Sequence, residues 1–591
     1  MIPTRNFDLL ERFVKLFPGR DVLAAKKDGR WTYYTSEQYS EISHQFGYGL
    51  LEMGLKPGDK IITITNNRPE WNFVDMGMAM AGIVHVPVYT SLSCEEYEYI
   101  LEHSGARMVI TSDTKLYEFI KPLCEKVKSA EYVFTFDKIE GIPDWEEVVE
   151  TGRKSDQEVK KQLAKLKAGI KPDDFASLIY TSGTTGVPKG VMLSHDNMVK
   201  NFLAAADVFQ LTAEDRFLSI LPLCHVGGRL GNYQTQYSGA CIYYAENMGT
   251  IAVNMREIKA TGFDAVPRIL EKIYDNVMAK GRSLSGIKKR LFFRAVNLGL
   301  QYEPHGRKGW FYYRKHKVAD KLIFSKWREA LGGEVRLVGC GGASLQPRLE
   351  KVFWAAGVKI LNMYGLTETS PIITINRQEK EGCRLGTVGA LIDGVELKLD
   401  EDGEILCKGH NVMLGYYKDE ELTRSVFNED GWFRTGDIGE WIDGKFLTIT
   451  DRKKDIFKLS SGKFVAPQVI ENKLKESAFI GHVMVTGEHQ KFASALVVPD
   501  FDFLKEWGRS RNMITDQEHH EIICMPGVQM VFKKEIDRLN NHLAESERIL
   551  RFRIVPDDWS PLTGELSASL KLKRRVIESK YKDLLEVIYR N

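Results

Sequence analysis

The sequence predicts an α/β fold: a large N-terminal domain with mostly parallel sheets and a β-rich subdomain, followed by a small α+β C-terminal domain. Short β-prone segments alternate with helix-length segments through most of the chain, which is the pattern of parallel α/β sheets. The 591 residues are also too many for one hydrophobic core, so we expect two or more domains.

The N-terminal elements follow from apolar runs and from the residues that interrupt them. We expect strands near residues 31–34, 60–65, 83–89, 107–111 and 178–181, and helices over 37–53, 70–81 and 94–104. Thr35 or Ser36 is the expected N-cap of the first helix. Later segments predict a strand at 217–223, a strand that runs into a Gly-rich turn within 335–345, a strand with a polar tip within 358–371, and a helix that starts near Ala265.

Five consecutive charged residues, Asp451 to Asp455, separate two patterns. A β-rich region with turn signals precedes them, and a smaller α+β unit follows, with strands near 482–487 and 494–499 and an amphipathic region over 533–550. A solvated turn is the alternative interpretation of this charged run. We place the domain boundary here, which gives an N-terminal domain of residues 1–451 and a C-terminal domain of residues 452–591.

The composition is that of an ordinary globular protein, with 43% hydrophobic and 27% charged residues. A net charge of +2 argues against a general nucleic-acid binder. The eight cysteines form no CxxC pair and no metal-binding spacing, which is typical of reduced, mostly buried thiols in a cytoplasmic protein. The N-terminus carries no secretory h-region, and the longest apolar run, residues 76–89, is too short to span a bilayer.

The stretch LIYTSGTTGVPKGVMLSHD, residues 178–196, joins a buried strand to a loop of small residues and a lysine. Backbone N–H groups and hydroxyls of such a loop can surround phosphate oxygens, while the ammonium offsets their charge. Gly190 follows the lysine where a Walker A loop requires Ser or Thr, so this is a different kind of polyphosphate loop. A flexible surface loop is the alternative interpretation. The candidate phosphate-binding residues are Thr181, Ser182, Gly183, Thr184, Thr185 and Lys189.

Residues 280–330 form a basic and aromatic segment. It holds fourteen Lys or Arg against three Asp or Glu, a net charge of +11, and it includes the string GWFYYRKHK. One interpretation is a solvated helical face with long basic side chains. The other is a patch that binds anionic lipid headgroups, or the phosphates of a nucleotide-bearing substrate.

The small-residue loop resembles the phosphate loop of the adenylate-forming superfamily, which comprises acyl-CoA synthetases, peptide-synthetase adenylation domains and luciferases. Other motifs of that superfamily follow in the same order: VRLVGCGGASL, YGLTETSP, GWFRTGDIG and DRKKD. The resemblance covers essentially the whole chain. It is closest to the long-chain fatty acyl-CoA synthetases, through LPLCHV, AVPRILEKIY, FSKWREALGG and GELSASLKLKRRVIESKYKDLLEVIY.

The resemblance implies a set of ATP and AMP contacts. In the YGLTET string, Thr367 would bind an α-phosphate oxygen, and Glu368 would supply the hard oxygen ligand that Mg²⁺ requires. Asp437 and Arg452 would hold the ribose hydroxyls. Lys571 falls where the family places its catalytic lysine. The adenine would lie against Gly341, Gly342, Ala343, Tyr364 and Gly365, with the tyrosine ring stacked on the base.

The resemblance also implies an acyl pocket and a hinge. His225 and Arg229 would belong to the pocket, whose apolar walls we expect within residues 225–239 and 335–364. Long-chain members often carry an acidic residue before the equivalent arginine, where this chain has Gly228. Lys454 matches the family's hinge position, about which the small C-terminal domain would be mobile. Residues 567–569 are Ser-Ala-Ser where Thr-Pro-Thr is more usual, and Lys571 is retained.

The function implied by the resemblance is that of an AMP-forming long-chain-fatty-acid–CoA ligase. It would convert a fatty acid, ATP and CoA into acyl-CoA, AMP and pyrophosphate through an acyl-adenylate, with Mg²⁺ as cofactor. Two alternatives stay open: a fatty acyl-AMP ligase that loads a carrier-protein thiol, and an inactive homologue that binds acyl groups or nucleotides. We expect a cytoplasmic protein, without nucleic-acid partners, that contacts the inner membrane face peripherally if the basic segment binds anionic lipid.

Overall fold

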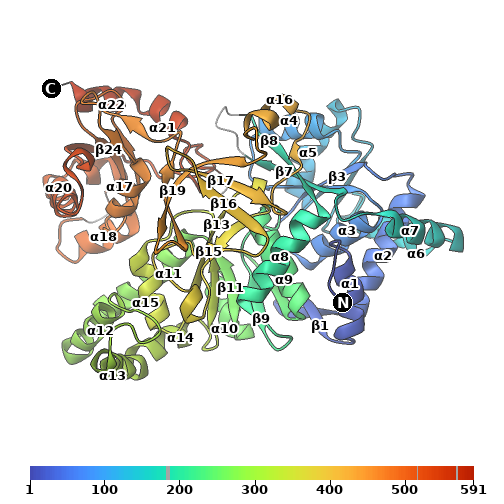
Figure 1. The fold of residues 1–591 in the computed structure, drawn as a ribbon, viewed down its shortest axis with the longest axis horizontal. Helices are drawn as coiled ribbons and strands as arrows, with labels where there is room; N and C mark the ends of the chain where they lie inside the picture. Colours follow the sequence, from blue (N-terminus) through green and yellow to red (C-terminus); the bar gives the residue numbers. More distant parts are fainter. Residues whose placement is uncertain (182–186, 515–516, 568–569, 591) are drawn as a thin grey trace. The chain divides into compact units, whose positions relative to one another are not determined.

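The computed structural model describes residues 1–181, 187–514, 517–567 and 570–590. It consists of two compact units (Figure 1). Unit 1 comprises Met1–Leu397 and Cys407–Arg434, and unit 2 comprises Lys398–Leu406 and Thr435–Asn591. The chain thus enters unit 2 for one short segment before it does so for the rest of its length. The predicted domain boundary after residue 451 stays a prediction.

Unit 1 contains two sheets whose central strands are parallel, as the sequence predicts. The seven-stranded sheet has the order β18 (Gly415–Tyr416), β8 (Lys189–Ser194), β7 (Phe175–Thr181), β4 (Val84–Val88), β3 (Lys60–Ile64), β5 (Met108–Thr111) and β6 (Tyr132–Thr135). The nine-stranded sheet has the order β15 (Ala390–Leu391), β14 (Ile372–Ile375), β13 (Lys359–Gly365), β12 (Leu337–Cys340), β11 (Gly262–Ala265), β9 (Arg216–Ser219), β10 (Cys241–Tyr244), β1 (Asp21–Lys27) and β2 (Arg30–Thr35).

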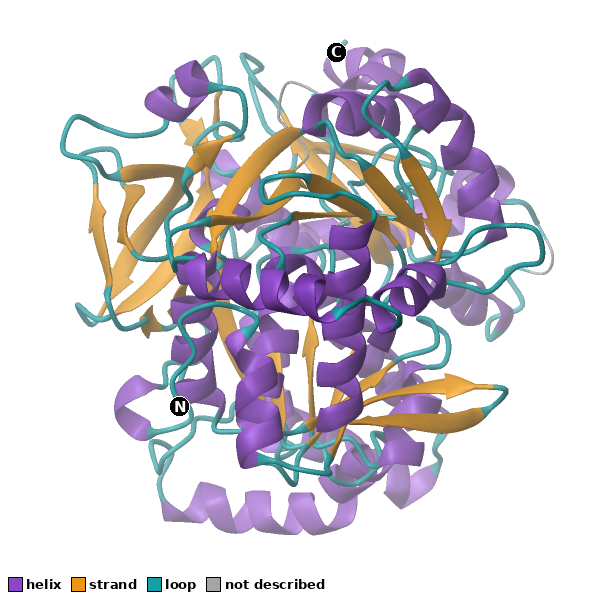
Figure 2. Cartoon of the chain, turned by 90° about the vertical axis from the view of Figure 1, so that its right-hand side faces the viewer, coloured by secondary structure: helices purple, strands orange, loops and turns teal. Residues whose placement is uncertain are grey.

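Helices pack against these sheets and bury their apolar residues, because parallel strands are apolar on both faces (Figure 2). Thr35 caps the second helix by accepting a hydrogen bond from the Gln38 N–H, as predicted. The helices of unit 1 are α1 (Asp8–Leu16), α2 (Ser36–Glu52), α3 (Pro69–Met80), α4 (Cys94–Ser104), α5 (Thr114–Lys126), α6 (Trp145–Arg153), α7 (Gln157–Gly169), α8 (His195–Phe209), α9 (Val226–Ser238), α10 (Ile251–Ile258), α11 (Pro267–Ser283), α12 (Gly286–Gly299), α13 (Trp310–Ala319), α14 (Ser325–Ala330), α15 (Pro347–Ala355) and α16 (Glu420–Ser425). The described part of unit 1 also contains three short helical turns: η1 (Asp320–Phe324), η2 (Thr367–Thr369) and η3 (Lys380–Gly382).

Unit 2 has its own apolar core. It holds β20 (Phe446–Arg452) together with residues 435–442 of β19 (Phe433–Ile442), residues 404–406 of β17 (Glu404–Gly409) and residues 398–399 of β16 (Val395–Leu399), and these strands form a four-stranded sheet in the order β16, β17, β19, β20. It also holds the pair β21 (Phe457–Lys458) and β22 (Phe464–Val465), and a sheet of β23 (Ile480–Thr486), β24 (Ser494–Pro499) and β25 (Arg551–Ile554). Its helices are α17 (Pro467–Leu474), α18 (Phe501–Arg509), α19 (His519–Cys524), α20 (Pro526–Asn540), α21 (Arg574–Lys580) and α22 (Lys582–Tyr589), with the turn η4 (Glu545–Glu547). Across the described residues of both units, no helix has the length and apolar character needed to cross a bilayer.

Two predicted elements end earlier than expected, and an asparagine side chain explains each case. The strand predicted over 217–223 stops at Ser219, because Asn67 bonds the Leu221 carbonyl at 2.7 Å and the Leu223 N–H at 3.0 Å in place of a neighbouring strand. In the amphipathic region predicted over 533–550, the α-helix α20 ends at Asn540, whose side-chain amide bonds both the N–H and the carbonyl of Ile549 at 2.9 Å.

Candidate active site

The predicted phosphate loop connects two antiparallel strands of unit 1. Thr181 ends β7 and Lys189 begins β8, and the two residues are register partners across the hairpin. The two ends of the loop therefore lie next to each other, where β7 ends and β8 begins. Ser182, Gly183, Thr184 and Thr185 lie outside the described residues, so their phosphate contacts stay predictions.

Lys189, the lysine of this loop, and Glu368, the proposed metal ligand, both interact with the side chain of Tyr416. The Lys189 ammonium lies 5.3 Å from the centre of the Tyr416 ring, within the range of a cation–π interaction. The Tyr416 hydroxyl donates a 2.8 Å hydrogen bond to Oε1 of Glu368. Burial, followed by the charge of Glu368, raises the pKa of Tyr416, so its proton remains on the hydroxyl at neutral pH. One residue thus positions a cation and a carboxylate that the sequence separates widely.

Tyr416 is the functional candidate that sequence reasoning missed. It lies in β18, which pairs antiparallel with β8 so that Tyr416 is opposite Val191. The string GYY, residues 415–417, gives no sign of this pairing, because it lies in a region that the sequence marks only as β-rich. A two-residue strand is below the length at which apolar alternation is informative.

The predicted adenine contacts lie at the carboxyl ends of parallel strands, where open α/β sheets bind ligands. β11, β12 and β13 are neighbours in parallel, and Gly341 and Gly365 lie at the ends of the last two. A Cβ at Gly341 would approach Met363 Cγ to 2.8 Å, and one at Gly365 would approach the Pro371 carbonyl to 1.7 Å, so the latter position admits only glycine. Exposed or half-buried residues complete this edge: Gly342, Ala343 and Tyr364.

The residues of η2 fit a magnesium ion. Thr367 and Glu368 are both half-buried, and a carboxylate oxygen is the ligand type that Mg²⁺ prefers. The Glu368 backbone carbonyl accepts a 2.9 Å hydrogen bond from the Met413 N–H, which fixes the residue from the other side. Oε1 of Glu368 accepts the hydrogen bond from the Tyr416 hydroxyl. Within the described ranges, no hydrogen bond or ion pair engages Oε2. Glu368 therefore offers an oriented carboxylate with one oxygen left for a cation.

His225 and Arg229 take different places in α9. His225 is the N-cap of the helix, and its Nδ1 accepts a 3.0 Å hydrogen bond from the Gly227 N–H. Arg229 is 2% exposed, and its guanidinium lies 2.6 Å from Oδ1 of Asp75. A Cβ at Gly228 would approach the Pro222 carbonyl to 2.3 Å, so this backbone leaves no room for the acidic residue that is frequent there in the resembling family. The acyl-pocket roles of His225 and Arg229 stay predictions.

Arg229 belongs to a buried polar network. Its Nε donates to the Tyr233 hydroxyl at 2.8 Å, and that hydroxyl donates to Oδ2 of Asp75 at 2.5 Å. His85 Nδ1 lies 2.6 Å from Oδ1 of Asp75. Burial would raise the pKa of Asp75, but the Arg229 charge and the hydrogen bonds outweigh it and hold the pKa below its usual value. Burial lowers the pKa of His85, which disfavours a charged imidazole. The charged groups of the network are therefore the Asp75 carboxylate and the Arg229 guanidinium.

In unit 2 the two predicted ribose ligands lie beside each other. Asp437 of β19 and Arg452 of β20 are register partners in an antiparallel pair. The Arg452 Nε is 3.2 Å from Oδ1 of Asp437, whose side chain is 6% exposed while that of Arg452 is 45% exposed. The buried carboxylate is thus oriented by a more accessible guanidinium. The ribose contacts themselves stay predictions.

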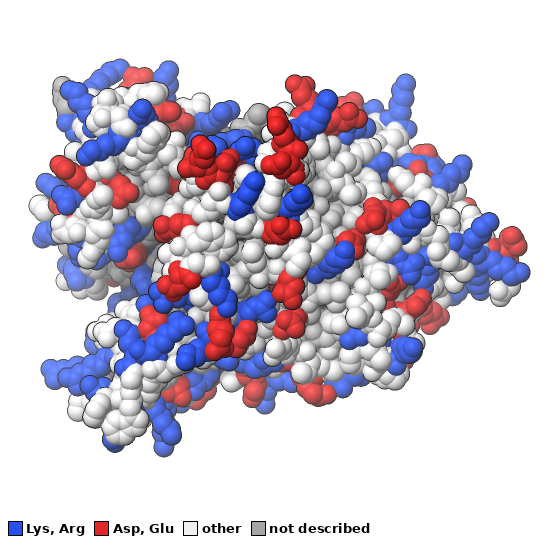
Figure 3. Space-filling model, viewed as in Figure 1, with Lys and Arg blue, Asp and Glu red and all other residues white. Residues whose placement is uncertain are grey.

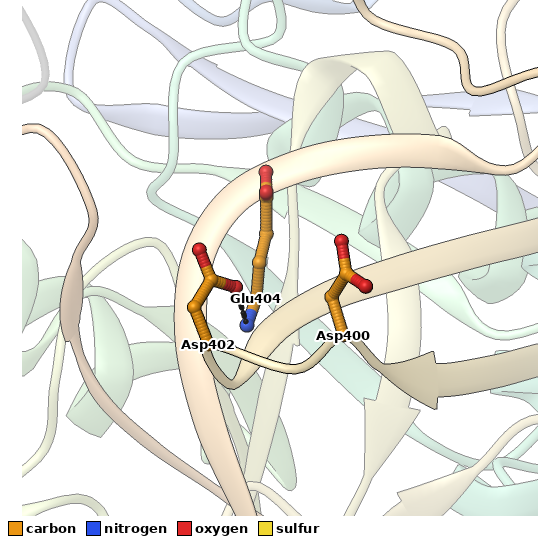
Figure 4. Close-up of side chains that lie close together, drawn as sticks. All are labelled: Asp400, Asp402 and Glu404. Atoms are coloured by element: carbon orange, nitrogen blue, oxygen red, sulfur yellow. Dashed lines mark hydrogen bonds between the residues drawn. The ribbon is translucent and has the colours of Figure 1, made fainter.

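Three carboxylates near the predicted hinge form a cluster: Asp400, Asp402 and Glu404 (Figure 4). The Lys453 ammonium binds Asp402 at 2.6 Å and Glu404 at 2.8 Å, so the cluster is a lysine anchor rather than a metal site. Hydrogen bonding to Lys453 lowers the pKa of Asp402. The anchored lysine directly precedes Lys454, which is exposed in the turn after β20.

Lys571 belongs to unit 2, and the residue is exposed. Its N–H donates to the Ser567 hydroxyl at 3.0 Å, and its carbonyl accepts a 2.8 Å bond from the Ser567 N–H. Both of these bonds use the backbone of Lys571, so they do not depend on its side chain.

Comparisons with known proteins identify the family of the chain. The family described as AMP-binding enzyme matches residues 10–417, and its C-terminal domain family matches residues 454–591. Long-chain-fatty-acid–CoA ligase FadD15 of Mycobacterium bovis is 31% identical, with 95% of this chain and 93% of the ligase covered. The peroxisomal long chain acyl-CoA synthetase 7 of Arabidopsis thaliana is also 31% identical, with 95% and 83% covered.

Solved structures show the same fold. The anthranilate CoA ligase AuaEII in complex with anthranoyl-AMP superposes with a TM-score of 0.73 at 20% identity, over 99% of both chains. The adenylation domain of a carboxylate reductase from Mycobacterium chelonae gives a TM-score of 0.77 at 20% identity, over 99% of this chain and 91% of that domain. Sequence motifs, fold and relatives agree, and the chain therefore belongs to the AMP-binding enzymes, the adenylate-forming family that includes the long-chain-fatty-acid–CoA ligases.

Proposed function

We propose that this protein is an AMP-forming fatty acyl-CoA ligase that acts on long-chain fatty acids. The observation that carries the proposal is the Lys189–Tyr416–Glu368 arrangement beside the predicted phosphate loop, in a chain whose 31%-identical relatives are named as such ligases. ATP and CoA are its co-substrates. Glu368 would hold Mg²⁺, which supplies positive charge to the phosphate oxygens when bound.

The first step joins two anions, and the proposed residues offset their repulsion. A fatty carboxylate oxygen attacks the α-phosphorus of ATP, the bond to the β-phosphate oxygen breaks, and pyrophosphate leaves. Lys189 would neutralise the leaving phosphates, and Thr367 would bind an α-phosphate oxygen. Lys571 would approach the reacting carboxylate, and the half-buried Tyr364 would stack on adenine. Asp437 and Arg452 would hold the ribose.

The second step forms the thioester. The CoA sulfur attacks the acyl carbon, the bond to the phosphate oxygen breaks, and AMP leaves with the electron pair. We assign no side chain as the base that removes the thiol proton. Lys571 would have to leave the site first, by a rotation about Lys454. Lys453, held by Asp402 and Glu404, would fix one side of that hinge.

A chain-length series tests the proposed reaction. Purified protein with ATP, Mg²⁺ and CoA should form more thioester as the fatty acid lengthens, up to a limit, because each buried CH₂ contributes about 0.8 kcal/mol. Pyrophosphate release and thioester should appear in equal amounts. Pyrophosphate release without thioester, restored by a carrier-protein thiol, would favour the acyl-AMP ligase alternative. Preference for acetate over dodecanoate would contradict the long-chain assignment.

We also propose that the basic segment contacts an anionic membrane surface. Blue side chains surround uncharged surface on the part of unit 1 that carries α12 and α13 (Figure 3). No residue of α13 is buried. Phe311 and Val318 are 76% and 59% exposed, and Leu322 of η1 is 50% exposed, at a spacing that places them on one face. Exposed aromatic and aliphatic groups among lysines and arginines are typical of surfaces that lie on lipid.

Vesicle sedimentation tests this surface. Binding to vesicles with anionic lipid should exceed binding to neutral vesicles and should weaken in high salt, since each basic residue near the surface contributes about 1 kcal/mol. Trp310→Ser with Phe311→Ser should weaken binding. Met248→Ser is the matched control, because Met248 is 64% exposed but lies outside the segment. Equal binding to both vesicle types would favour the solvated-face interpretation.

A further inference from the structure

Asp264 is a buried carboxyl group that the proposed mechanism does not use. It lies in β11, in register with Gly339 of β12. Its Oδ1 atom is buried and has no hydrogen-bond partner among the described residues, while the residue as a whole keeps part of its surface exposed. Burial alone raises the pKa of Asp264 to about 7. A polar group in this condition is unusual, because buried polar atoms almost always have partners.

Two glycines make the space that this side chain fills. A Cβ at Gly231 of α9 would lie 1.8 Å from Oδ2 of Asp264, and a Cβ at Gly339 would lie 2.2 Å from Oδ1. The same Gly339 position would be 2.8 Å from Phe209 Cζ and 3.0 Å from Met363 Cε. The carboxyl group therefore lies between α9 and β12 and next to apolar atoms. Alanine at either glycine would displace it.

This location coincides with the expected acyl pocket. The sequence assigns the pocket walls to residues 225–239 and 335–364, and Asp264 contacts both segments through Gly231 and Gly339. An unbranched apolar tail passing here would leave the carboxyl unsatisfied, which costs free energy. A hydroxyl on the tail could donate to the carboxylate, or accept from the protonated acid.

We propose that Asp264 is a specificity-determining residue that hydrogen-bonds a hydroxyl group carried by the acyl chain, so that hydroxylated fatty acids are preferred substrates. The proposal rests on the proposed function and narrows its substrate class. A hydroxyl suits this site better than an ammonium, because Phe209 and Met363 present apolar atoms on the Gly339 side and an ammonium would lose far more hydration energy on burial.

Competing substrates test the proposal. Thioester formation is measured with hexadecanoic acid, with isomers that carry one hydroxyl at successive carbons, and with the terminal amino analogue. Wild-type protein should prefer one hydroxylated isomer to hexadecanoic acid by about tenfold in kcat/KM, which is the worth of a typical buried hydrogen bond. Asp264→Leu should abolish this ratio and increase activity on hexadecanoic acid. Asp264→Asn keeps the size and a hydrogen-bonding group, and should retain part of the preference.

A second buried carboxyl group serves as the control. Asp144 accepts a 2.8 Å hydrogen bond from the Glu146 N–H, so Asp144→Asn changes a buried carboxyl that already has its partner and lies outside the expected pocket walls, and it should leave the substrate ratio unchanged. Thermal unfolding checks that each variant folds. If Asp264→Leu does not fold, the substrate ratio of Asp264→Asn alone tests the proposal. An unchanged ratio in both Asp264 variants, or a preference for the amino analogue, would overturn the proposal. If the Asp264 variants and the wild-type protein form thioester from every acid with the same substrate ratio, this inference alone is refuted. If no thioester forms from any acid, the proposed function is refuted as well.

Discussion

Replacing Lys571 with Ala is expected to slow acyl-AMP formation by about 10²–10³-fold or more, and to leave thioester formation from supplied acyl-AMP near the wild-type rate. The ammonium is needed only where two anions meet, and in acyl-AMP that repulsion is already gone. The variant should fold normally, because the bonds of Lys571 to Ser567 use the main chain, which Ala preserves. Pyrophosphate release and thioester formation, measured separately, give the two rates.

Two further variants make the Lys571 result specific. Lys573→Ala removes a lysine two residues away and should leave both half-reactions unchanged. Lys454→Pro should have the opposite pattern to Lys571→Ala, since it stiffens the proposed hinge after the Lys453 anchor and does not touch the adenylation residues. Equal slowing of both half-reactions by Lys571→Ala would show that the lysine serves a shared site or a structural role, and would contradict the domain rotation.

Local chemistry explains why most of the fold could be predicted. The parallel strands are buried runs such as Lys60–Ile64 and Val84–Val88, and turn residues separate them from helices with ordinary caps such as Thr35. Errors occurred where a distant side chain replaced a backbone partner. Asn67 ends the strand at Ser219 in this way, although the following residues are apolar. Such a bond joins residues far apart in sequence and has no local signal.

The candidate site was predictable as a set of residues and not as an arrangement. Motif resemblance named Lys189 and Glu368 but could not show that Tyr416 lies between them. It also placed Arg229 in the acyl pocket, while the structure pairs its charge with Asp75. Asp264 belongs to none of the sequence motifs. Its location becomes apparent only from Gly231 and Gly339, which lie on other elements of the structure.

The pairing of Arg229 leads to the second large expected effect, which is on stability. Arg229→Ala should lower the free energy of unfolding by about 3–5 kcal/mol, because it leaves the Asp75 carboxylate buried without its counter-charge. That loss is a large share of the roughly 5–15 kcal/mol that stabilises a typical domain. His85 cannot compensate at neutral pH, since burial lowers its pKa and protonation there is unfavourable. Urea unfolding of the whole protein measures the change.

A double variant separates the ion pair from a role in substrate binding. Arg229→Met with Asp75→Asn removes both charges, and it should be less destabilised than the two single changes combined, by about 0.5–3 kcal/mol. Arg268→Ala is the matched control, because Arg268 is 42% exposed and its pair with Glu271 contributes only about 0–1 kcal/mol. If Arg229→Ala unfolded like the wild type while the chain-length preference changed, Arg229 would be a pocket residue. Its contact with Asp75 would then serve to orient it toward the acyl chain, and the buried network would not be a main source of stability.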